Sequence, residues 1–421
     1  MNIFKPLRNN RGMALMIVTA CLMFIMYFAV ELIAETRIEY EINSSGMNRI
    51  KAYYAAKSGM QLSLLRVKIY QTAQNKFGQQ LGSNSPLLNM IWQFPFAWPM
   101  PIPDELTAID KDNFKKLVKD SSMDASYITT IEDEGSKIDI NDLVSPSETL
   151  RKITKQQILN IFLQKMKEDE KWARENSNTN FERVVNNIAD FMSDKSQSAN
   201  GGDKRATYSS MNSEFQSDYF PPNRSFRTIS ELHFVPELTD ELYEILEPRI
   251  TIYGMKGINP NIATRDVLKS LDPGMTDEAV TEIIKRRDDQ NQGGPFKDAD
   301  DFWNFVTTKN VRLEGKPEDV PLVFDAVFNF RIRSTGEFAR STSEITVITM
   351  DLNKTVAKIK DYVDKDKKAQ NPGADAGNPG GSGSGSGGSG SGGSAGGDGK
   401  TQGKSDPIPK GPPRIVFWGE R

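Results

Sequence analysis

The sequence contains only one cysteine and one histidine in 421 residues. The single cysteine, Cys21, excludes an intramolecular disulfide, so no covalent staple holds this fold in any compartment. The single histidine, His233, lies in the segment Ser-Glu-Leu-His-Phe-Val-Pro, with no nucleophile motif nearby. A Ser-His-Asp triad or a histidine-containing metal cluster would have to use this one residue. Since no catalytic constellation is visible in the sequence, we expect no enzyme activity.

The chain also lacks an excess of positive charge. Its formal net charge is −3, from 53 Lys and Arg against 56 Asp and Glu. Binding to nucleic acid needs local positive charge opposite the phosphates, so we expect no nucleic-acid partner. The length allows two or three domains. A hydrophobic content of 37% and a charged content of 26% indicate that most of the chain is soluble and folded.

One long apolar run is present, close to the N-terminus. No charged side chain occurs from Met13 to Val30, and a helix of this length spans about 27 Å, near the thickness of a bilayer core. The segment before it carries Lys5, Arg8 and Arg11 and no acid. This asymmetry predicts a single membrane span with the short N-terminal segment in the cytoplasm.

Three interpretations of the run are open at this point. A secretory signal peptide needs a small-residue cleavage site, and the residues 30–35, Val-Glu-Leu-Ile-Ala-Glu, match one poorly. An uncleaved signal anchor is the second. The third is a short basic leader that ends in Gly12 and runs directly into apolar residues, which resembles the leader of type IV pilins and pseudopilins. That resemblance implies cleavage between Gly12 and Met13 by a membrane-bound prepilin peptidase.

The helical pattern continues beyond the membrane run. Apolar residues fall largely at three- and four-residue steps from Ile38 to Val67. The small residues within 52–59, Ala-Tyr-Tyr-Ala-Ala-Lys-Ser-Gly, would let the helix lie close against a sheet. One helix from Met13 to about Tyr70 would be about 87 Å long, half in lipid and half on a globular head. The alternative is a break at residues 43–46, Asn-Ser-Ser-Gly, between an anchor and a separate soluble helix.

Strands are predicted on both sides of a central helical region. Residues 71–110 are expected to be loop-rich, and their aromatic, Pro-rich part at 91–103 either covers the core or forms an exposed interaction surface. Residues 126–143 contain two β-rich runs around a Gly turn, which predicts a hairpin. Further strands are predicted within 323–333 and 343–350.

The C-terminal part combines a linker pattern with a strand pattern. Residues 373–400 are dominated by Gly and Ser, a composition typical of a flexible linker. The apolar run Ile-Val-Phe-Trp at 415–418 follows, and it predicts a last strand that returns to the sheet.

The region from Ser147 to Val320 is predicted to be helical, with helices over 153–167 and 181–191 among others. Residues 258–287 read as two helices around a turn at Asp272–Met275 and resemble a helix-hairpin-helix module. Such modules bind DNA phosphates through backbone amides, so the alternative function is a membrane-anchored DNA-uptake protein. The acidic side chains at this turn would repel phosphate, which favours a structural role.

In this order, the segments resemble the minor pseudopilin K family of type II secretion systems. The resemblance covers nearly the whole chain except the Gly/Ser-rich tract, and residues 11–15, 52–59, 133–141, 188–194, 230–232, 258–264 and 415–418 carry it. It implies an α+β fold. A long N-terminal helix with a transmembrane half packs on an antiparallel pilin-like sheet, which a large helical, SAM-like or helix-hairpin-helix-like insert interrupts.

The resemblance also implies an organisation and a role. The parts are a cleaved leader (1–12), the transmembrane half of the helix (13–34), the first part of the pilin-like domain (35–146), the helical insert (147–320), returning strands (321–372), a Gly/Ser-rich linker (373–411) and a terminal strand (412–421). The protein would cross the inner membrane once, with its bulk in the periplasm. It would sit at the tip of the pseudopilus with other minor pseudopilins and support export of folded proteins across the outer membrane.

Ile17 fits the same family. Most pilins carry Glu as the fifth mature residue, and members of this family lack it. In a stacked fibre that carboxylate can offset the buried α-amino charge of a neighbouring subunit. A subunit with no neighbour above it would instead place an uncompensated charge in lipid.

Members of the family can bind calcium in the insert, and the resemblance implies Asp190, Asp194 and Asp203 as candidate ligands. Oxygen ligands suit calcium. The spacing, however, does not follow an EF-hand, and the Glu that the family commonly carries near the Gly before Asp203 is missing. A solvated acidic loop is the alternative.

Overall fold

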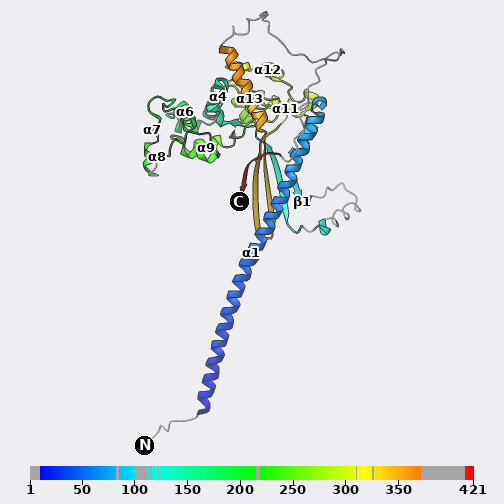
Figure 1. Ribbon diagram of the computed structural model, residues 1–421, viewed down its shortest axis with the longest axis vertical. Coiled ribbons are helices and arrows are strands. Elements are labelled where there is room, and N and C mark those ends of the chain that lie inside the picture. Colours follow the sequence, from blue (N-terminus) through cyan, green and yellow to red (C-terminus); the bar gives the residue numbers. More distant parts are fainter. Residues whose placement is uncertain are drawn as a thin grey trace, which may run out of the picture.

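The computed structural model describes residues 10–81, 85–100, 112, 116, 118–121, 123–214, 219–309, 311–324, 327–370 and 413–421. It has the shape of a long stem with a folded head at one end (Figure 1). Most of the predicted leader, the end of the aromatic segment at 101–103 and the whole Gly/Ser-rich linker lie outside the described residues.

Helix α1 forms the stem and part of the head. It runs without interruption from Asn10 to Leu81, a length of 72 residues. The alternative of a break at residues 43–46 is therefore wrong, because one exposed Gly costs a helix only about 1 kcal/mol. The loop expected from residue 71 is also wrong as far as Leu81, since Ala73 still packs on the core beneath the helix.

The upper half of α1 packs on a five-stranded antiparallel sheet with strand order β1-β2-β5-β6-β7. Its strands are β1 (Phe96–Trp98), β2 (Ser126–Asp133), β5 (Phe330–Phe338), β6 (Ser341–Thr349) and β7 (Ile415–Glu420). Every second residue of β2 is buried, as expected when one face of a sheet is covered. The last strand, β7, pairs with β6, so the terminal apolar run returns to the sheet as its sequence indicates.

Aromatic side chains fill the space between α1 and the sheet. Tyr70 of α1, Trp92 of helix α2 (Pro86–Gln93) and Phe330 of β5 meet edge to face, with ring centroids 5.5–6.3 Å apart. Phe94, two residues beyond Trp92, is 63% exposed. The aromatic segment therefore covers the core at its start and faces solvent a few residues later.

The predicted hairpin at 126–143 is wrong. Strand β3 (Ile138–Asp139) leaves β2 and pairs in parallel with β4 (Ile250–Thr251), in a second, two-stranded sheet. The neighbours of β2 are β1 and β5, and β5 pairs with it along all eight residues. The Gly turn is thus the point at which the chain leaves the first sheet for the helical insert, and Ile138 and Ile140 are buried in the core of that insert.

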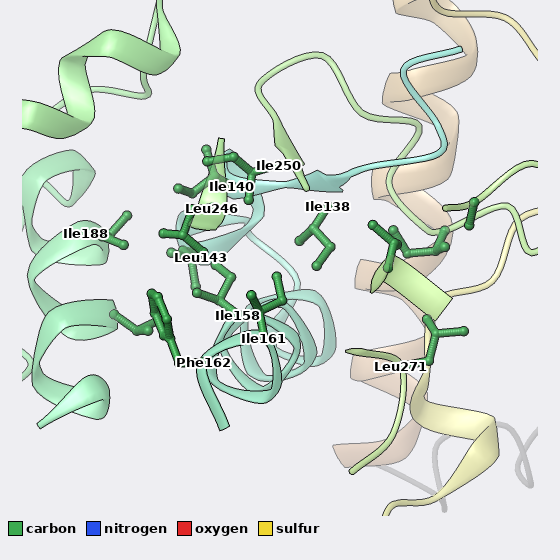
Figure 2. Close-up of a cluster of buried hydrophobic side chains, with 14 of the residues drawn as sticks. Ile138, Ile140, Leu143, Ile158, Ile161, Phe162, Ile188, Leu246, Ile250 and Leu271 are labelled. Atoms are coloured by element: carbon green, nitrogen blue, oxygen red, sulfur yellow. The ribbon is translucent and has the colours of Figure 1, made fainter. Parts of the chain in front are cut away.

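The insert is built from short helices around one apolar core (Figure 2). The α-helices are α4 (Glu148–Glu168), α5 (Glu170–Glu175), α6 (Phe181–Met192), α7 (Lys204–Thr207), α8 (Ser209–Glu214), α9 (Asp240–Leu246), α10 (Arg265–Ser270), α11 (Asp277–Asp288) and α12 (Ala299–Thr307). Helix α4 lies centrally, and its Ile158, Ile161 and Phe162 point into this core. Several helices begin with a side-chain cap, such as Ser147 on Leu150 N and Asn180 on Arg183 N, which satisfies otherwise unpaired amides.

A helix that the sequence did not predict follows β6. Helix α13 (Leu352–Gln370) leads from the sheet to the start of α4. There the Asp366 carboxylate accepts hydrogen bonds from Ser147 Oγ (2.6 Å) and Glu148 N (2.8 Å). The insert and the chain segment before the linker are therefore joined at the N-terminus of α4.

Candidate functional site

The stem exposes the apolar side chains of the predicted membrane run. From Met13 to Ile33 the large apolar side chains are 53–74% exposed, and they include Ile17 at 60%. The helix over Met13–Gly78 is long and apolar enough to cross a membrane, and none of its most apolar window is buried in the protein. A helix that is apolar on all sides and uncovered matches a bilayer or the stems of other subunits. Cleavage between Gly12 and Met13 stays a prediction.

The upper half of α1 makes a close contact with the sheet. A Cβ atom added to Gly336 of β5 would lie 2.1 Å from Ala52 O and 2.4 Å from Ala56 N. One added to Gly59 would lie 2.6 Å from Ser334 Oγ, which itself donates a 2.7 Å hydrogen bond to Ala56 O. The small residues expected to let the helix approach a sheet are the residues at this contact.

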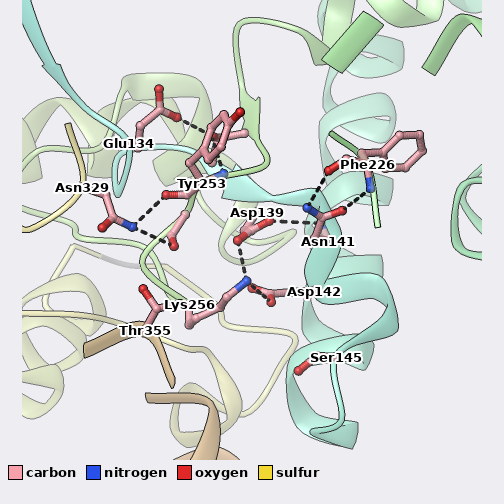
Figure 3. Close-up of polar contacts among 12 residues, drawn as sticks. Glu134, Asp139, Asn141, Asp142, Ser145, Phe226, Tyr253, Lys256, Asn329 and Thr355 are labelled. Atoms are coloured by element: carbon pink, nitrogen blue, oxygen red, sulfur yellow. Dashed lines mark hydrogen bonds and ion pairs between the residues drawn. The ribbon is translucent and has the colours of Figure 1, made fainter. Parts of the chain in front are cut away.

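Buried polar groups join the sheet to the helical insert. Glu134, at the end of β2, is 1% exposed and binds both Arg331 of β5 and Thr251 of β4. Asn329, next to β5, donates from Nδ2 to the carbonyl oxygens of Tyr253 (2.9 Å) and Gly254 (3.2 Å) (Figure 3). The Glu134–Thr251 bond and the two Asn329 bonds cross between the two parts of the head and fix their relative position, while the Glu134–Arg331 bond lies within the sheet.

A second buried group lies at the same junction. The Lys256 ammonium donates to Asp139 Oδ2 at 2.6 Å and to Asp142 Oδ1 at 2.8 Å (Figure 3). Burial and the charge of Asp139 raise the pKa of Asp142 to about 7, against the attraction of Lys256. Burial alone would lower the pKa of Lys256, but the two carboxylates outweigh it and raise that pKa. Lys256 therefore stays charged.

These junction residues were not predicted from the sequence. Asp139 and Asp142 alternate with Ile138, Ile140 and Leu143, and acids within an apolar run are a signal of buried charge. Their partner Lys256 is more than a hundred residues away, however, and only the fold brings it to them.

The Asp272–Met275 turn joins α10 to α11, and its amides bind within the protein. Gly274 N donates to Asp272 Oδ1 (2.8 Å) and Met275 N to Asp272 O (3.0 Å). The Asp272 carboxylate also accepts from Glu314 N (3.1 Å) and Gly315 N (2.9 Å). These amides are engaged and an acid lies among them, so the turn has the structural role that its acidic residues favour, and nothing supports the DNA-binding alternative.

His233 lies at the surface. Its Nδ1 is 3.0 Å from Asp240 Oδ1, and its ring packs on Tyr243 with centroids 4.1 Å apart. These contacts give the residue a place in the packing of α9 against the preceding 3-10 helix (Ile229–Phe234).

The three predicted calcium ligands do not form one oxygen cluster. Asp190 is 5% exposed, and its carboxylate accepts from Ser198 Oγ (2.6 Å) and from Ala199 N (3.0 Å). Asp203 caps α7 by accepting from Arg205 N (3.0 Å), and Asp194 faces solvent. Within the described ranges, no three Asp, Glu, His or Cys side chains gather into a group that could hold a metal ion. The residues therefore do not fit calcium as a set, and calcium binding stays a prediction.

Two family models match the chain. Both are described as type II secretion system (T2SS), protein K, and they match residues 136–255 and residues 258–324. Apart from residues 256 and 257, these ranges contain the helical insert, and they include the junction residues Asp139, Asp142 and Thr251. This chain belongs to the type II secretion system protein K family. The resemblance is thereby confirmed, and the chain is a minor pseudopilin of a type II secretion system.

A solved structure has a similar fold. It is one chain of the crystal structure of the GspK–GspI–GspJ complex from the type 2 secretion system of enterotoxigenic Escherichia coli. The match has a TM-score of 0.50 at 16% sequence identity and covers 76% of this chain and 95% of that chain. It confirms the predicted fold class, a pilin-like long helix on an antiparallel sheet with a large helical part. None of the curated proteins matches the chain.

Proposed function

We propose that this minor pseudopilin caps the periplasmic pseudopilus and is held in the inner membrane by a single pass over residues 13–34. Its role is structural: it closes an assembly and performs no chemical reaction. The observation that carries the proposal is the position of the helical insert, at the end of the sheet away from the stem (Figure 1).

The stem supplies the contacts below the tip. Its apolar side chains are exposed on all sides over more than twenty residues. Exposing these side chains to lipid carries no hydrophobic cost, and in a fibre they can pack against the stems of the subunits beneath. Association below the head therefore needs no further surface.

The insert opposes stacking above. A shaft subunit must accept another subunit on its upper side, and here that side carries the helices around α4 and α12 (Figure 1). Ile17 supports the same position, because a subunit with no neighbour above has no α-amino group to compensate a carboxylate at that depth.

Other minor pseudopilins are the proposed partners. The crystal structure of similar fold is a complex of GspK with GspI and GspJ, and we propose a hetero-complex of the same kind here. The prepilin peptidase acts earlier, on the leader, and leaves Met13 as the first residue.

Counting subunits tests the proposal. Pseudopili purified from cells that express the chain at its native level should contain far fewer copies of it than of the main shaft subunit. The I17E variant should not form fibres of its own, because the insert still covers the upper side. Fibres in which this chain is the main component, with or without the substitution, would rule out the tip position.

A further inference from the structure

The loop between α6 and α7, residues 193–203, closes on itself as a small hairpin. Ser198 N donates to Gly202 O (3.1 Å), and Lys204 N donates to Ser196 O (3.0 Å). Gly201 and Gly202 have φ of +89° and +82°, which glycine adopts without strain. This closure sets the Lys204 side chain beneath the loop.

Lys204 is buried although it carries a charge. The residue is 3% exposed, and its Nζ donates to Ser193 O at 2.6 Å and to Asn223 Oδ1 at 2.6 Å. An ammonium has three donors and no acceptor, so both oxygens serve it as hydrogen-bond acceptors. Burial lowers the pKa of Lys204, and the nearby Asp190 and Asp194 carboxylates oppose that change.

These groups are the kinds of ligand that calcium takes. A backbone carbonyl and a side-chain amide oxygen bind one positive charge, the Asp190 and Asp194 carboxylates lie near enough to act on it, and calcium sites in proteins are built from the same kinds of oxygen. Here the positive charge that these oxygens bind is the ammonium of Lys204, a side chain of the protein itself. A divalent ion beside it would meet the repulsion of the ammonium and would find the Asp190 oxygens already bonded to Ser198 and Ala199.

We propose that the Lys204 ammonium is the cation of this loop and that the loop therefore folds without calcium. The resemblance to the family implied a metal at this place, and the chain instead carries a tethered positive charge that no chelator can remove. The head would then keep its structure at any calcium concentration in the periplasm.

Thermal unfolding of the full chain in detergent tests the proposal. The melting temperature of the wild-type protein should be the same in millimolar calcium and in chelator. K204M removes the charge at similar side-chain length and should melt lower in both buffers, by roughly 5 °C, because a buried charged donor and its two acceptors lose their bonds. K195M, which removes an exposed lysine from the same loop, is the matched control and should melt as wild type does.

A second measurement keeps the proposal testable if K204M does not fold. Hydrogen exchange of the wild-type amides in residues 193–204 should be equally slow in calcium and in chelator, and a calcium titration by calorimetry should give no binding heat. A wild-type melting temperature or amide protection that rises with calcium would overturn the proposal, as would a K204M protein that melts like K195M.

Discussion

The two halves of helix α1 follow different physical rules within one unbroken helix. Between Met13 and Ile33 the large apolar side chains point outward on all sides, and none of the described residues covers them. Between Ala52 and Tyr70 one face is buried against the sheet, and the residues there that lie closest to it are Ala and Gly. The exposed apolar surface of the lower half suits lipid or the stems of other subunits, and the small residues of the upper half allow a short distance to β5.

This difference separates two kinds of mutation. In the lower half, a substitution should act through the membrane or through assembly and leave the head folded. In the upper half, a single added methyl group should act on the free energy of unfolding of the head itself.

The largest expected effect lies at the start of the stem. G12V should block processing, because a peptidase that cuts after a glycine has no room for a branched side chain. Mass spectrometry of the membrane-inserted protein should find Met13 as the first residue in the wild type and Met1 in G12V. A wild-type protein that begins at Met1 or near Ala34 would show that the leader was misinterpreted.

The next effect concerns the helix–sheet contact. G336A should destabilise the head by about 3 kcal/mol or more, since its Cβ would lie 2.1 Å from a backbone oxygen and the backbone must move. Gly46 lies on α1 outside this contact, and a Cβ added there meets no atom within 4 Å. The G46A variant should therefore be neutral or stabilise the protein by about 1 kcal/mol. Urea unfolding of both variants checks the comparison, and equal stabilities would refute the close contact.

The buried carboxyl group of Asp133, near the upper half of α1, should make the stability of the head depend on pH. Asp133 is 5% exposed, and burial raises its pKa to about 7 from 3.8. Below pH 4 both states hold the proton. From about pH 4 to pH 7 the unfolded chain releases it while the folded chain keeps it, so stability falls by up to roughly 4 kcal/mol and then stays constant.

The D133N variant isolates this effect. It should lose that part of the pH dependence and become more stable than wild type above pH 7. D361N, at an exposed acid on α13, is the control and should keep the wild-type profile. Parallel profiles for D133N and wild type between pH 4 and pH 7 would mean that Asp133 is ionised in the folded protein.

The smallest effect is expected in the segment between β6 and β7, outside the helix–sheet contact. Met350 N donates to Arg414 O at 3.0 Å, so the ends of the segment between β6 and β7 already touch. Replacing residues 352–412 with a short Gly-containing turn should cost about 1 kcal/mol, from the loss of the Asp366 contact at α4. Circular dichroism melting measures it, and loss of the folded head would show that α13 carries more of the structure.

Local patterns predicted most of the secondary structure. Helix α1, the strand β6 and the helices α4 and α6 follow from periodicity in the sequence itself. The strand predicted within 323–333 is displaced, because β5 begins only at Phe330 and continues to Phe338. The extension of α1 beyond Tyr70 to Leu81 could not be predicted, because Tyr70 and Ala73 pack on a sheet whose strands come much later in the chain. The pairing of β3 with β4 was missed for the same reason, since a Gly turn after β2 is equally compatible with a hairpin and with an exit from the sheet.

The candidate site shows the same limit. The apolar stem and the small residues at 52–59 were predictable, because each property lies in a short stretch of sequence. The clusters around Lys256 and Lys204 were not, since their carboxylate and carbonyl partners come from other elements. The family resemblance implied a metal at Asp190, Asp194 and Asp203, and only the fold shows that the Lys204 ammonium lies near the first two.

Site-specific photo-crosslinking in assembled pseudopili tests the tip position most directly. A crosslinker at Met23, exposed on the stem, and one at Asp300, exposed on α12 in the insert, probe the two ends of the molecule. The Met23 position should give adducts with other pseudopilins, and the Asp300 position should give none with any pseudopilin. Adducts of equal strength from Asp300 to a pseudopilin would place a subunit above the insert and contradict the account.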